Sequence, residues 1–447
     1  MTTLWQASQQ LQAGNVQPET FTQAALAAAR DPEKEGARVF ITRYEAQATQ
    51  QAIEAGERWQ ARQSRSPIDG LPISIKDLFD VKGEATTAGS RLLSDAPVAT
   101  ANASVVEKLN RAGAAIVGKT NMTEFAFSGL GINPHYGTPA NPWRREEKRI
   151  PGGSSSGAAV AVADGLCLGA IGTDTGGSVR IPAALCGLTG FKPGASRIDQ
   201  AGTLPLAPSL DSIGVIAHDV RSCWLLDSII AEKPLEMRES DLRHARFAVP
   251  QTRVLDDLDR DVAQAWQYAL DLLREAGATL VALPLTELDE LNSLNARGGI
   301  TAYEAWQWHQ RTALARPEAY DPQVLMRLQR GSQLTEQDAA ELYQQRAAWQ
   351  RRINTALEGF DALLMPTVPQ IAPTIASLDE PQRYMEINAL MLRNTSVINM
   401  LDGCAISLPC HPAGHAPVGL SLAAVHGDDA RLISWAVAVE TALTRRS

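Results

Sequence analysis

The feature that most limits how this chain can fold is residues 150–193, where two glycine–serine clusters lie within an apolar stretch. The first cluster, GGSSSG at 152–157, precedes an alanine- and valine-rich run that predicts a helix. Serine is a preferred residue at a helix N-terminus, because its hydroxyl accepts an unpaired backbone N–H. Taken alone, the first cluster therefore indicates helix capping and no chemistry.

The second cluster, DTGGS at 174–178, supports a stronger interpretation. It follows the run 166–174, which predicts a buried strand, and precedes a short predicted helix over 178–187. Consecutive glycines let the backbone turn sharply and point N–H groups at an anion, and Ser178 lies in the positive field of the helix that follows. One loop could therefore supply a serine nucleophile and its oxyanion hole.

A serine nucleophile also needs a base, and none of the seven histidines lies in a motif that singles it out. Lysine can act as the base if burial lowers its pKa, because an apolar environment disfavours the ammonium form. Lys76 interrupts the otherwise apolar run 71–81, which predicts a strand, and alternation along that strand places Asp77 on the opposite face. Taken alone, a strand lysine is more often a solvated surface residue.

Hydrophobic periodicity predicts an α/β protein. Helices are expected over residues 4 to about 64, where Phe40, Tyr44 and Ala48 recur at helical spacing, and over 105–112, 257–276 and 334–358. Further strands are expected at 114–118, 246–250, 279–285, 361–369, 405–410 and 418–425. This alternation favours one large sheet covered by helices, without repeats or an evident domain boundary.

Together, Lys76, Ser154 and Ser178 closely resemble the catalytic residues of the amidase signature family. Members carry a lysine on an I-x-x-K-D strand, here ISIKD at 73–77, and two serines 24 positions apart, as Ser154 and Ser178 are. Further matches lie at 118–126, 137–143, 365–367, 394–410 and 417–421, so that the resemblance covers residues 5–445. One departure is Ser156, which stands where many members have glycine and affects only local loop geometry.

The resemblance implies the amidase signature fold, a single large mixed β-sheet covered by helices on both faces, in one domain over residues 1–447. Its expected parts are an N-terminal helical segment (1–66), a signature core with the lysine and both serines (67–200), and the remaining sheet with the wall of the substrate pocket (201–447).

The resemblance further implies that a Ser–cisSer–Lys triad hydrolyses a carboxylic amide through an acyl-enzyme, without a metal or organic cofactor. Neutral Lys76 would accept a proton from Ser154, which would accept one from Ser178 as the latter attacks the carbonyl. The implied oxyanion hole consists of backbone N–H groups of Thr175, Gly176, Gly177 and Ser178. Asp174 and Arg180 are expected to hold this loop in place or to form a structural ion pair. The expected substrate-binding residues are Met122, Phe125, Ser128, Gly129, Gly153 and Ile181, although Phe125 could equally belong to the core.

Composition argues against several other kinds of protein. A net charge of −9 and a pI near 5.4 disfavour a nucleic-acid surface, which needs clustered lysine and arginine. No membrane span or secretory signal is expected, and five scattered cysteines are typical of reduced intracellular thiols, so we expect a cytoplasmic protein. The expected partner is a small-molecule amide. A homodimer is left open, since the N-terminal helices could pack on their own sheet or on a second copy.

The sequence leaves several alternative functions open. The motif G-x-S-x-G at 153–157 would make Ser155 the nucleophile of an α/β-hydrolase, but the polar residues 145–151 before it do not predict the strand that such a fold needs. A glutamine-hydrolysing amidotransferase A-type subunit typically has R-Q-P after the nucleophile, where this chain has RIP at 180–182. An allophanate- or carbamoyl-type hydrolase is another alternative, because the first cluster with Ser156 is similar to that of allophanate hydrolases. A silent binding protein is disfavoured, because all three triad residue types are retained.

The sequence gives a weaker indication of the substrate. Ile181, the apolar loop 122–127 and the lack of an identifiable carboxylate-binding residue favour a small aryl or alkyl primary amide. The pattern of residues 171–187 is also similar to bacterial indoleacetamide-type hydrolases. We therefore expect a stand-alone amidase that acts on an uncharged amide.

Overall fold

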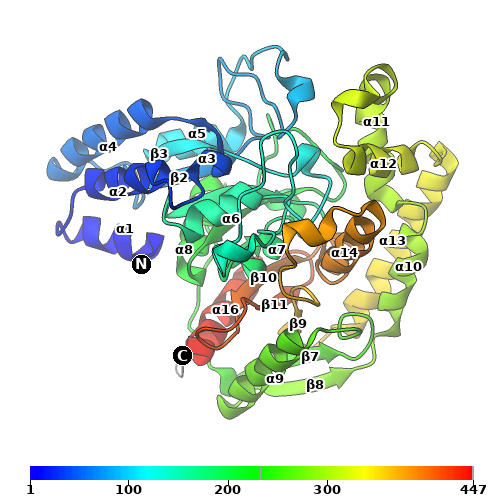
Figure 1. The fold of residues 1–447 in the computed structure, drawn as a ribbon. Coiled ribbons are helices and arrows are strands. Elements are labelled where there is room, and N and C mark those ends of the chain that lie inside the picture. The colour runs from blue at the N-terminus through cyan, green and yellow to red at the C-terminus, as the bar shows by residue number, and fades with distance from the viewer. Residues whose placement is uncertain (232, 445–447) are drawn as a thin grey trace.

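A computed structural model describes residues 1–231 and 233–444, and within them eleven strands form one sheet (Figure 1). Across the sheet lie β1 (Phe40–Arg43), β3 (Ala115–Thr120), β2 (Pro72–Lys76), β4 (Gly169–Asp174), β6 (Ser212–Ala217), β5 (Thr189–Lys192), β10 (Cys404–Pro409), β11 (Gly419–Ala424), β9 (Ala362–Pro366), β7 (Arg246–Pro250) and β8 (Thr279–Leu283). β2 runs parallel to β3 and β4, and β7 runs parallel to β8 and β9, whereas the other neighbours are antiparallel. The predicted mixed sheet is confirmed.

Helices cover both faces of this sheet. A Cβ at Gly172 of β4 would meet Ser155 and Val179, next to α6 (Ser156–Ala163) and α7 (Arg180–Leu185), whereas one at Gly169 would meet Leu226 of α8 (Val220–Ile230). Because side chains alternate along a strand, α6 and α7 lie on one face and α8 on the other. α8 packs against α5 (Ser104–Ala112), α16 (Asp429–Thr444) and α1 (Leu4–Gln12). Buried apolar residues accordingly form separate clusters on the two faces here, one that includes α8 and one that includes α6.

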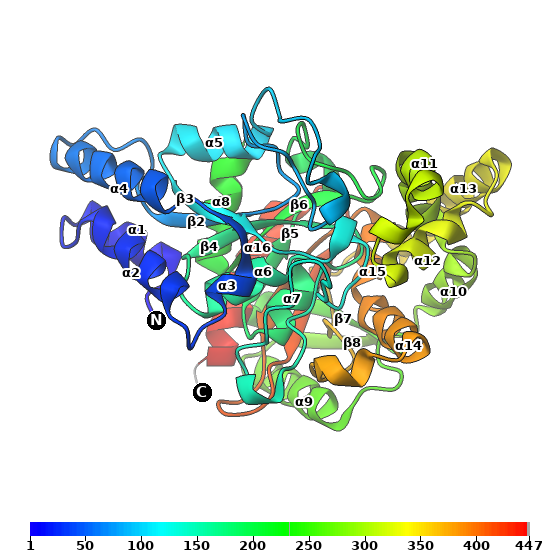
Figure 2. The same cartoon turned by 45° about the horizontal axis from the view of Figure 1, so that its top comes forward.

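The remaining helices gather at opposite ends of the sheet (Figures 1 and 2). At the end with β1 and β3 lie α1 (Leu4–Gln12), α2 (Pro18–Arg30), α3 (Gly36–Val39) and α4 (Glu45–Gln60). At the other end lie α10 (Glu290–Asn295), α11 (Gly299–Ala315), α12 (Pro322–Gly331), α13 (Glu336–Ala356), α14 (Pro381–Leu392) and α15 (Thr395–Leu401), while α9 (Arg260–Glu275) packs on β8 and β9. Short 3-10 helices lie at Arg91–Leu93, Glu124–Ala126, Arg145–Glu147, Ala195–Arg197, Leu242–His244, Thr286–Asp289, Pro317–Ala319 and Ile375–Leu378.

One part of the expected N-terminal helical segment is wrong. Phe40–Arg43 is not helical but forms strand β1, which pairs antiparallel with β3, and α4 begins only at Glu45. The run Val39-Phe40-Ile41-Thr42 is rich in β-branched residues, and backbone pairing with the free side of β3 outweighs the apparent helical spacing. Strands β5 and β6 were not predicted, and the strand expected over 71–81 ends at Lys76. In the part of the chain that the structure describes, no helix is long and apolar enough to cross a membrane.

Candidate active site

Sheet geometry places Lys76 at the candidate site. The carboxyl ends of the parallel strands β2 and β4 meet at one edge of the sheet, so Lys76, the last residue of β2, lies near Thr173 at the end of β4. The buried Lys76 Nζ donates hydrogen bonds to Ser154 Oγ at 2.7 Å and to Thr173 Oγ1 at 2.9 Å. Burial lowers the pKa of Lys76 to about 7, although the carboxylates of Asp174 and Asp211 partly oppose that shift. Near neutral pH this lysine can therefore exist as a free amine.

The first glycine–serine cluster brings Ser154 to this lysine. The peptide bond between Gly153 and Ser154 is cis, as the family resemblance implied. A Cβ at Gly153 would lie 2.5 Å from the backbone nitrogen of Gly131, so only glycine permits this close approach. Ser155 is the N-cap of α6, yet its side chain makes no capping hydrogen bond. Helix capping therefore does not explain this cluster.

The second cluster forms the loop between β4 and α7. The carboxylate of Asp174 accepts hydrogen bonds from the N–H groups of Gly177 at 2.9 Å and Val179 at 3.1 Å, which fixes the loop around Ser178. The carbonyl of Ser178 accepts a hydrogen bond from the N–H of Ser155 at 3.1 Å, which joins the two clusters. Among the described residues, the hydroxyls of Ser154 and Ser178 share no hydrogen bond.

The oxyanion hole expected from the resemblance changes in one member. The N–H of Gly177 already donates to Asp174, so it is engaged in holding the loop and is not free for a ligand. The N–H groups of Thr175, Gly176 and Ser178 have no acceptor within residues 1–231 and 233–444. Three of the four expected donors are thus available to an oxyanion.

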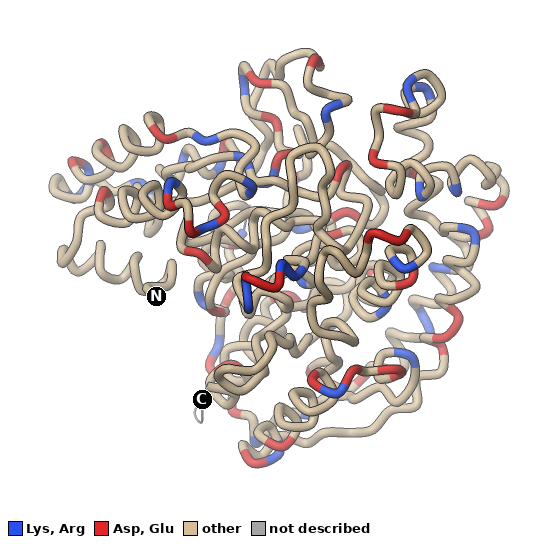
Figure 3. The backbone as a smooth tube through the Cα atoms, viewed as in Figure 1, with Lys and Arg blue, Asp and Glu red and all other residues tan. Residues whose placement is uncertain are grey.

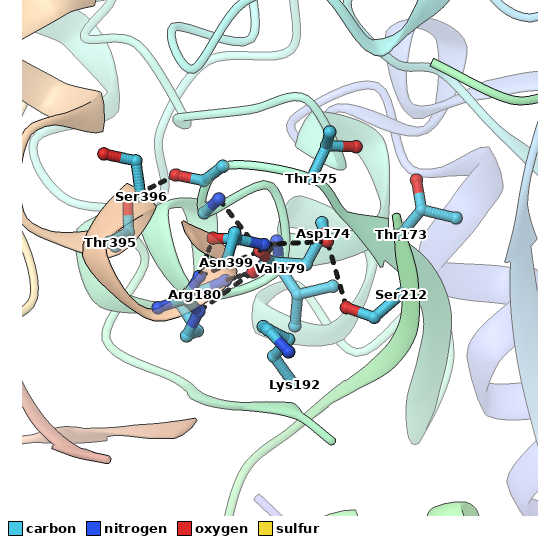
Figure 4. A network of polar contacts seen from close by, with 12 residues as sticks. Thr173, Asp174, Thr175, Val179, Arg180, Lys192, Ser212, Thr395, Ser396 and Asn399 are labelled. Atoms are coloured by element: carbon cyan, nitrogen blue, oxygen red, sulfur yellow. Dashed lines mark hydrogen bonds and ion pairs between the residues drawn. The ribbon is translucent and has the colours of Figure 1, made fainter. Parts of the chain in front are cut away.

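A fully buried ion pair supports the loop from below (Figure 4). Arg180 donates to the two carboxylate oxygens of Asp174, from Nε at 3.0 Å and from Nη2 at 2.9 Å. Asn399 of α15 accepts from Arg180 at 2.7 Å and donates to Asp174 at 2.9 Å. Burial alone would raise the pKa of Asp174, but the charge of Arg180 and these hydrogen bonds hold it well below its usual range. The sequence left open whether Asp174 and Arg180 hold the loop or form a structural ion pair. In the structure the ion pair itself holds the loop.

Two facing glycines let the loops approach the sheet closely. Gly172 of β4 and Gly214 of β6 are cross-strand partners. A Cβ at Gly172 would lie 2.6 Å from Ser155 Oγ, and one at Gly214 would lie 3.2 Å from Val179 Cγ2. A side chain at position 172 would push the first serine loop away from the sheet that carries Lys76, and one at 214 would also clash with the backbone carbonyl of Phe191, 2.5 Å from its Cβ.

Ser178 opens onto a cavity of about 490 Å³. Thr175, Gly176 and Ser178 line it, together with residues 126–128 and side chains from α10, α11, α12, α14 and α15. Of the residues expected to bind substrate, Ser128 lines this cavity. Its volume suits a small organic molecule.

The other expected substrate-binding residues do not line the cavity. Met122, Phe125 and Ile181 are buried in apolar clusters, and Phe125 packs edge-on against His309 at 4.4 Å between ring centroids. The backbone of Gly129 donates to Asn388 at 2.8 Å, and Gly153 packs against Gly131. These residues, from the segment 122–129, the first glycine–serine cluster and α7, therefore lie behind the cavity wall.

Sequence reasoning missed four arginines in the cavity wall. They are Arg253, Arg327, Arg330 and Arg393, with Glu386 as the acidic member of the wall. Arg327 and Arg330 share α12, whereas Arg253 and Arg393 come from two other segments. None of the four lies in a motif, so no signal short of the tertiary structure could group them. Their presence removes one ground for expecting an uncharged substrate, namely the lack of a carboxylate-binding residue.

No cluster suited to a metal ion, that is three or more histidine, cysteine, aspartate or glutamate side chains, occurs in the described residues. The five cysteines are buried and unpaired, and burial raises the pKa of the Cys167 and Cys410 thiols to about 12. The geometry thus combines a buried lysine, two serines and free backbone N–H groups next to a cavity.

Comparisons with known proteins give the family of this chain. The model of a family described as "Amidase" matches residues 22–433. A protein of Comamonas testosteroni named 2-amino-5-chloromuconic acid deaminase is 37% identical over 85% of this chain and 82% of its own length. The A-type subunit of the glutamyl-tRNA(Gln) amidotransferase from Chloroflexus aggregans is 33% identical over 95% of this chain and 92% of its own length.

Solved structures give the same result. A crystal structure described as that of an amidase superposes with a TM-score of 0.89 at 31% identity, over 98% of this chain and 99% of that one. The native peptide amidase of Stenotrophomonas maltophilia superposes with a TM-score of 0.81 at 24% identity, over 100% of this chain and 98% of that one, which shows a shared fold.

Proposed function

This chain belongs to the amidase family and is a hydrolase of carbon–nitrogen bonds, and we propose that it cleaves a small-molecule carboxylic amide through an acyl-enzyme. In this proposal Ser178 is the nucleophile, Ser154 relays its proton and Lys76 is the base. The observation that carries it is the 2.7 Å hydrogen bond from the buried Lys76 to Ser154, next to the loop that presents Ser178 to the cavity.

The lysine is suited to the role of base. With a pKa of about 7, a large share of Lys76 is neutral at physiological pH, and a base works best when its pKa lies near the working pH. Neutral Lys76 accepts the proton of Ser154 as Ser154 accepts that of Ser178, and the relay later returns a proton to the leaving nitrogen. This relay requires contact between the two hydroxyls, and such catalytic hydrogen bonds commonly tighten only when substrate binds.

The free backbone N–H groups of Thr175, Gly176 and Ser178 support the proposed acylation step. Donors fixed in advance stabilise the oxyanion that forms when Ser178 attacks the carbonyl, and loss of one such donor typically costs about 2.7 to 4 kcal/mol in the barrier. Asp174 and Arg180 are positioning residues, because they hold this loop without facing the cavity. Water then releases the acid.

A panel of primary amides tests this proposal. Ammonia release is followed for aliphatic amides, aryl amides, ω-carboxylated amides and glutamine, with Ser178→Ala as the control. We expect release from at least one amide, lost in the variant. No release from any amide, or release that survives Ser178→Ala, would contradict the proposal.

Two relatives give specific alternatives. The protein named 2-amino-5-chloromuconic acid deaminase suggests that ammonia could be released from an amino group of an unsaturated acid, so such an acid belongs in the panel. The amidotransferase relatives suggest glutamine hydrolysis for a partner protein, which release from glutamine alone would favour. An allophanate- or carbamoyl-type substrate, a cytoplasmic location and a homodimer stay predictions.

A further inference from the structure

Three arginines of the cavity wall carry a buried nitrogen without a hydrogen-bond partner among the described residues. These atoms are Nε of Arg253, Nε of Arg327 and Nη2 of Arg393. A buried guanidinium N–H that makes no hydrogen bond costs free energy, and more so for a charged group than for a neutral one. The remaining guanidinium nitrogens, namely Nη2 of Arg253, Nη1 and Nη2 of Arg327 and Nη1 of Arg393, are not buried and also have no hydrogen-bond partner among the described residues. Three poorly paired cations around one cavity therefore indicate a site for a negatively charged ligand.

Arg253 is the most enclosed of the three. Its side chain is 9% exposed, and Nη1 donates to Asn292 Oδ1 while Nε stays unpaired. Burial lowers its pKa, although the carboxylates of Asp289 and Asp256 partly oppose that shift. Arg253 thus lies in the wall as an almost fully desolvated charge.

Arg327 and Arg393 are half-buried and come from α12 and from the residue after α14. The guanidinium carbon of Arg327 lies 4.6 Å from the ring centroid of Phe127, and this contact holds the guanidinium plane. Burial lowers the pKa of Arg327 to about 10. Arg393 donates from Nε to Asn394 Oδ1 at 3.0 Å. In both cases the contacts orient the guanidinium and leave another nitrogen available.

Within residues 1–231 and 233–444, no carboxylate forms an ion pair with Arg253, Arg327 or Arg393. Glu386 also lines the cavity, but its carboxylate lies 3.6 Å from Arg383 and accepts from Gln382, so it is turned to its own helix. Elsewhere acidic and basic residues are interspersed along the chain (Figure 3), and the net charge is −9. The charges of Asp256 and Asp289 act on Arg253, and those of Asp256 and Asp257 act on Arg393, but none of these carboxylates lies within ion-pair distance. A group of arginines without a direct ion pair is therefore a local property of this cavity.

We infer that these arginines bind a carboxylate on the acyl part of the substrate, so that the substrate is a monoamide of a dicarboxylic acid. This inference rests on the proposed amide hydrolysis at Ser178. The planar guanidinium matches a carboxylate through paired N–H donors, which favours this anion over an uncharged aryl or alkyl group. The carboxylate binds at the arginines while the amide carbonyl lies at Ser178.

The reaction balances without any further reactant. The bond from Ser178 Oγ to the acyl carbon forms as the carbon–nitrogen bond breaks, and the leaving nitrogen takes the relayed proton. Water then cleaves the ester, so that one monoanionic amide and one water give one dicarboxylate dianion and one ammonium ion. The product has two carboxylates, of which the arginines bind one.

Matched substrate pairs test the inference. We would compare succinamate, glutaramate and adipamate with uncharged amides of equal chain length, and measure kcat/KM for the unmodified chain and for Arg253→Ala and Arg327→Met. We expect the carboxylated member to be preferred about 10- to 100-fold, and this preference to fall about tenfold or more in either variant. Arg274→Ala, an exposed arginine on α9, serves as the matched control and should keep the preference.

Binding gives a measurement that does not depend on turnover. Calorimetry with the Ser178→Ala chain should show binding of glutarate or adipate, weakened about tenfold or more by Arg253→Ala or Arg327→Met. Diacids that bind no better than the uncharged diamide glutaramide would overturn the inference, and so would tighter binding of inorganic phosphate than of any diacid. Cleavage of uncharged amides without a carboxylate preference would overturn it while leaving the proposed function intact. Diacid binding without cleavage of any amide would overturn the proposed amide hydrolysis while supporting the carboxylate site.

Discussion

Nζ of Lys119 lies 3.3 Å from the carboxylate of Asp77, and both side chains are buried. Asp77 directly follows Lys76 in the sequence, yet it points to the other side of the strand and is neutralised there. Thr87 and the N–H of Gly89 also donate to Asp77. The candidate base is therefore not paired with its neighbouring carboxylate, and its lowered pKa has a structural cause.

The first prediction concerns the pH dependence of activity. Lys76 must be neutral to accept a proton, so kcat/KM should rise with pH through about 7 and then level off. Initial rates with one amide between about pH 5.5 and 9 measure this profile. A profile that is flat across that range, or that falls with rising pH, would contradict the role of Lys76.

The second prediction concerns stability. The pKa of Lys76 is lowered from 10.5 to about 7 in the folded chain, so between these values the unfolded chain binds more protons and stability rises with pH. The difference in unfolding free energy between the unmodified chain and Lys76→Met should therefore shift in favour of the unmodified chain from pH 7 to about 10. Chemical denaturation at both pH values measures it. Lys82→Met, at an exposed position, should show no such change.

The third prediction separates the two serine interpretations. Ser178→Ala and Ser154→Ala should each lower kcat/KM by about 10³-fold or more, because each interrupts the proton relay. Ser155→Ala should cost much less, since within the described residues Ser155 Oγ makes a single hydrogen bond, to the carbonyl of Thr173 at 3.4 Å. Equal loss of activity in Ser155→Ala, with folding intact by circular dichroism, would favour an α/β-hydrolase elbow.

The fourth prediction compares neighbouring glycines. Gly177 has φ 134°, and a Cβ there would lie 2.1 Å from Thr395 Oγ1, so Gly177→Ala should displace the loop and lower kcat by about tenfold or more. At Gly176 the nearest atom would be Leu392 Cδ2 at 3.3 Å, so Gly176→Ala should be tolerated far better. Steady-state kinetics of the two variants provide the comparison, and a reversed order would exclude this account of the loop.

The fifth prediction concerns the buried ion pair. Arg180→Met leaves the carboxylate of Asp174 buried without its cation and should destabilise the fold by about 3 to 5 kcal/mol. The exposed pair of Arg243 and Asp241 offers a control, and Arg243→Met should leave the denaturation midpoint unchanged. Similar denaturation midpoints for both variants would show that the buried pair does not stabilise the fold.

Sequence could predict those features that depend on local pattern or on a shared motif. Strand β7 was predicted with the bounds observed, and the contact of Lys76 with Ser154 follows from the family resemblance. Strand β1 was not predicted, because its conformation depends on pairing with β3, more than 70 positions away. The wall arginines were missed for a similar reason, since Arg253 and Arg393 meet only once the second half of the chain is folded.

The two halves of the site come from different parts of the chain. Lys76, Ser154 and Ser178 come from strands and loops within residues 72–185, whereas Arg253, Arg327 and Arg393 come from segments that follow β7. Asn399 of α15 joins the two halves, because it holds Asp174 and Arg180 and also lines the cavity. Arg253 and Arg327 make no hydrogen bond to the loop around Ser178 among the described residues, so mutations at these two positions can alter which acid is accepted without moving the reacting groups. A family with this arrangement can acquire new substrates while its catalytic residues stay the same.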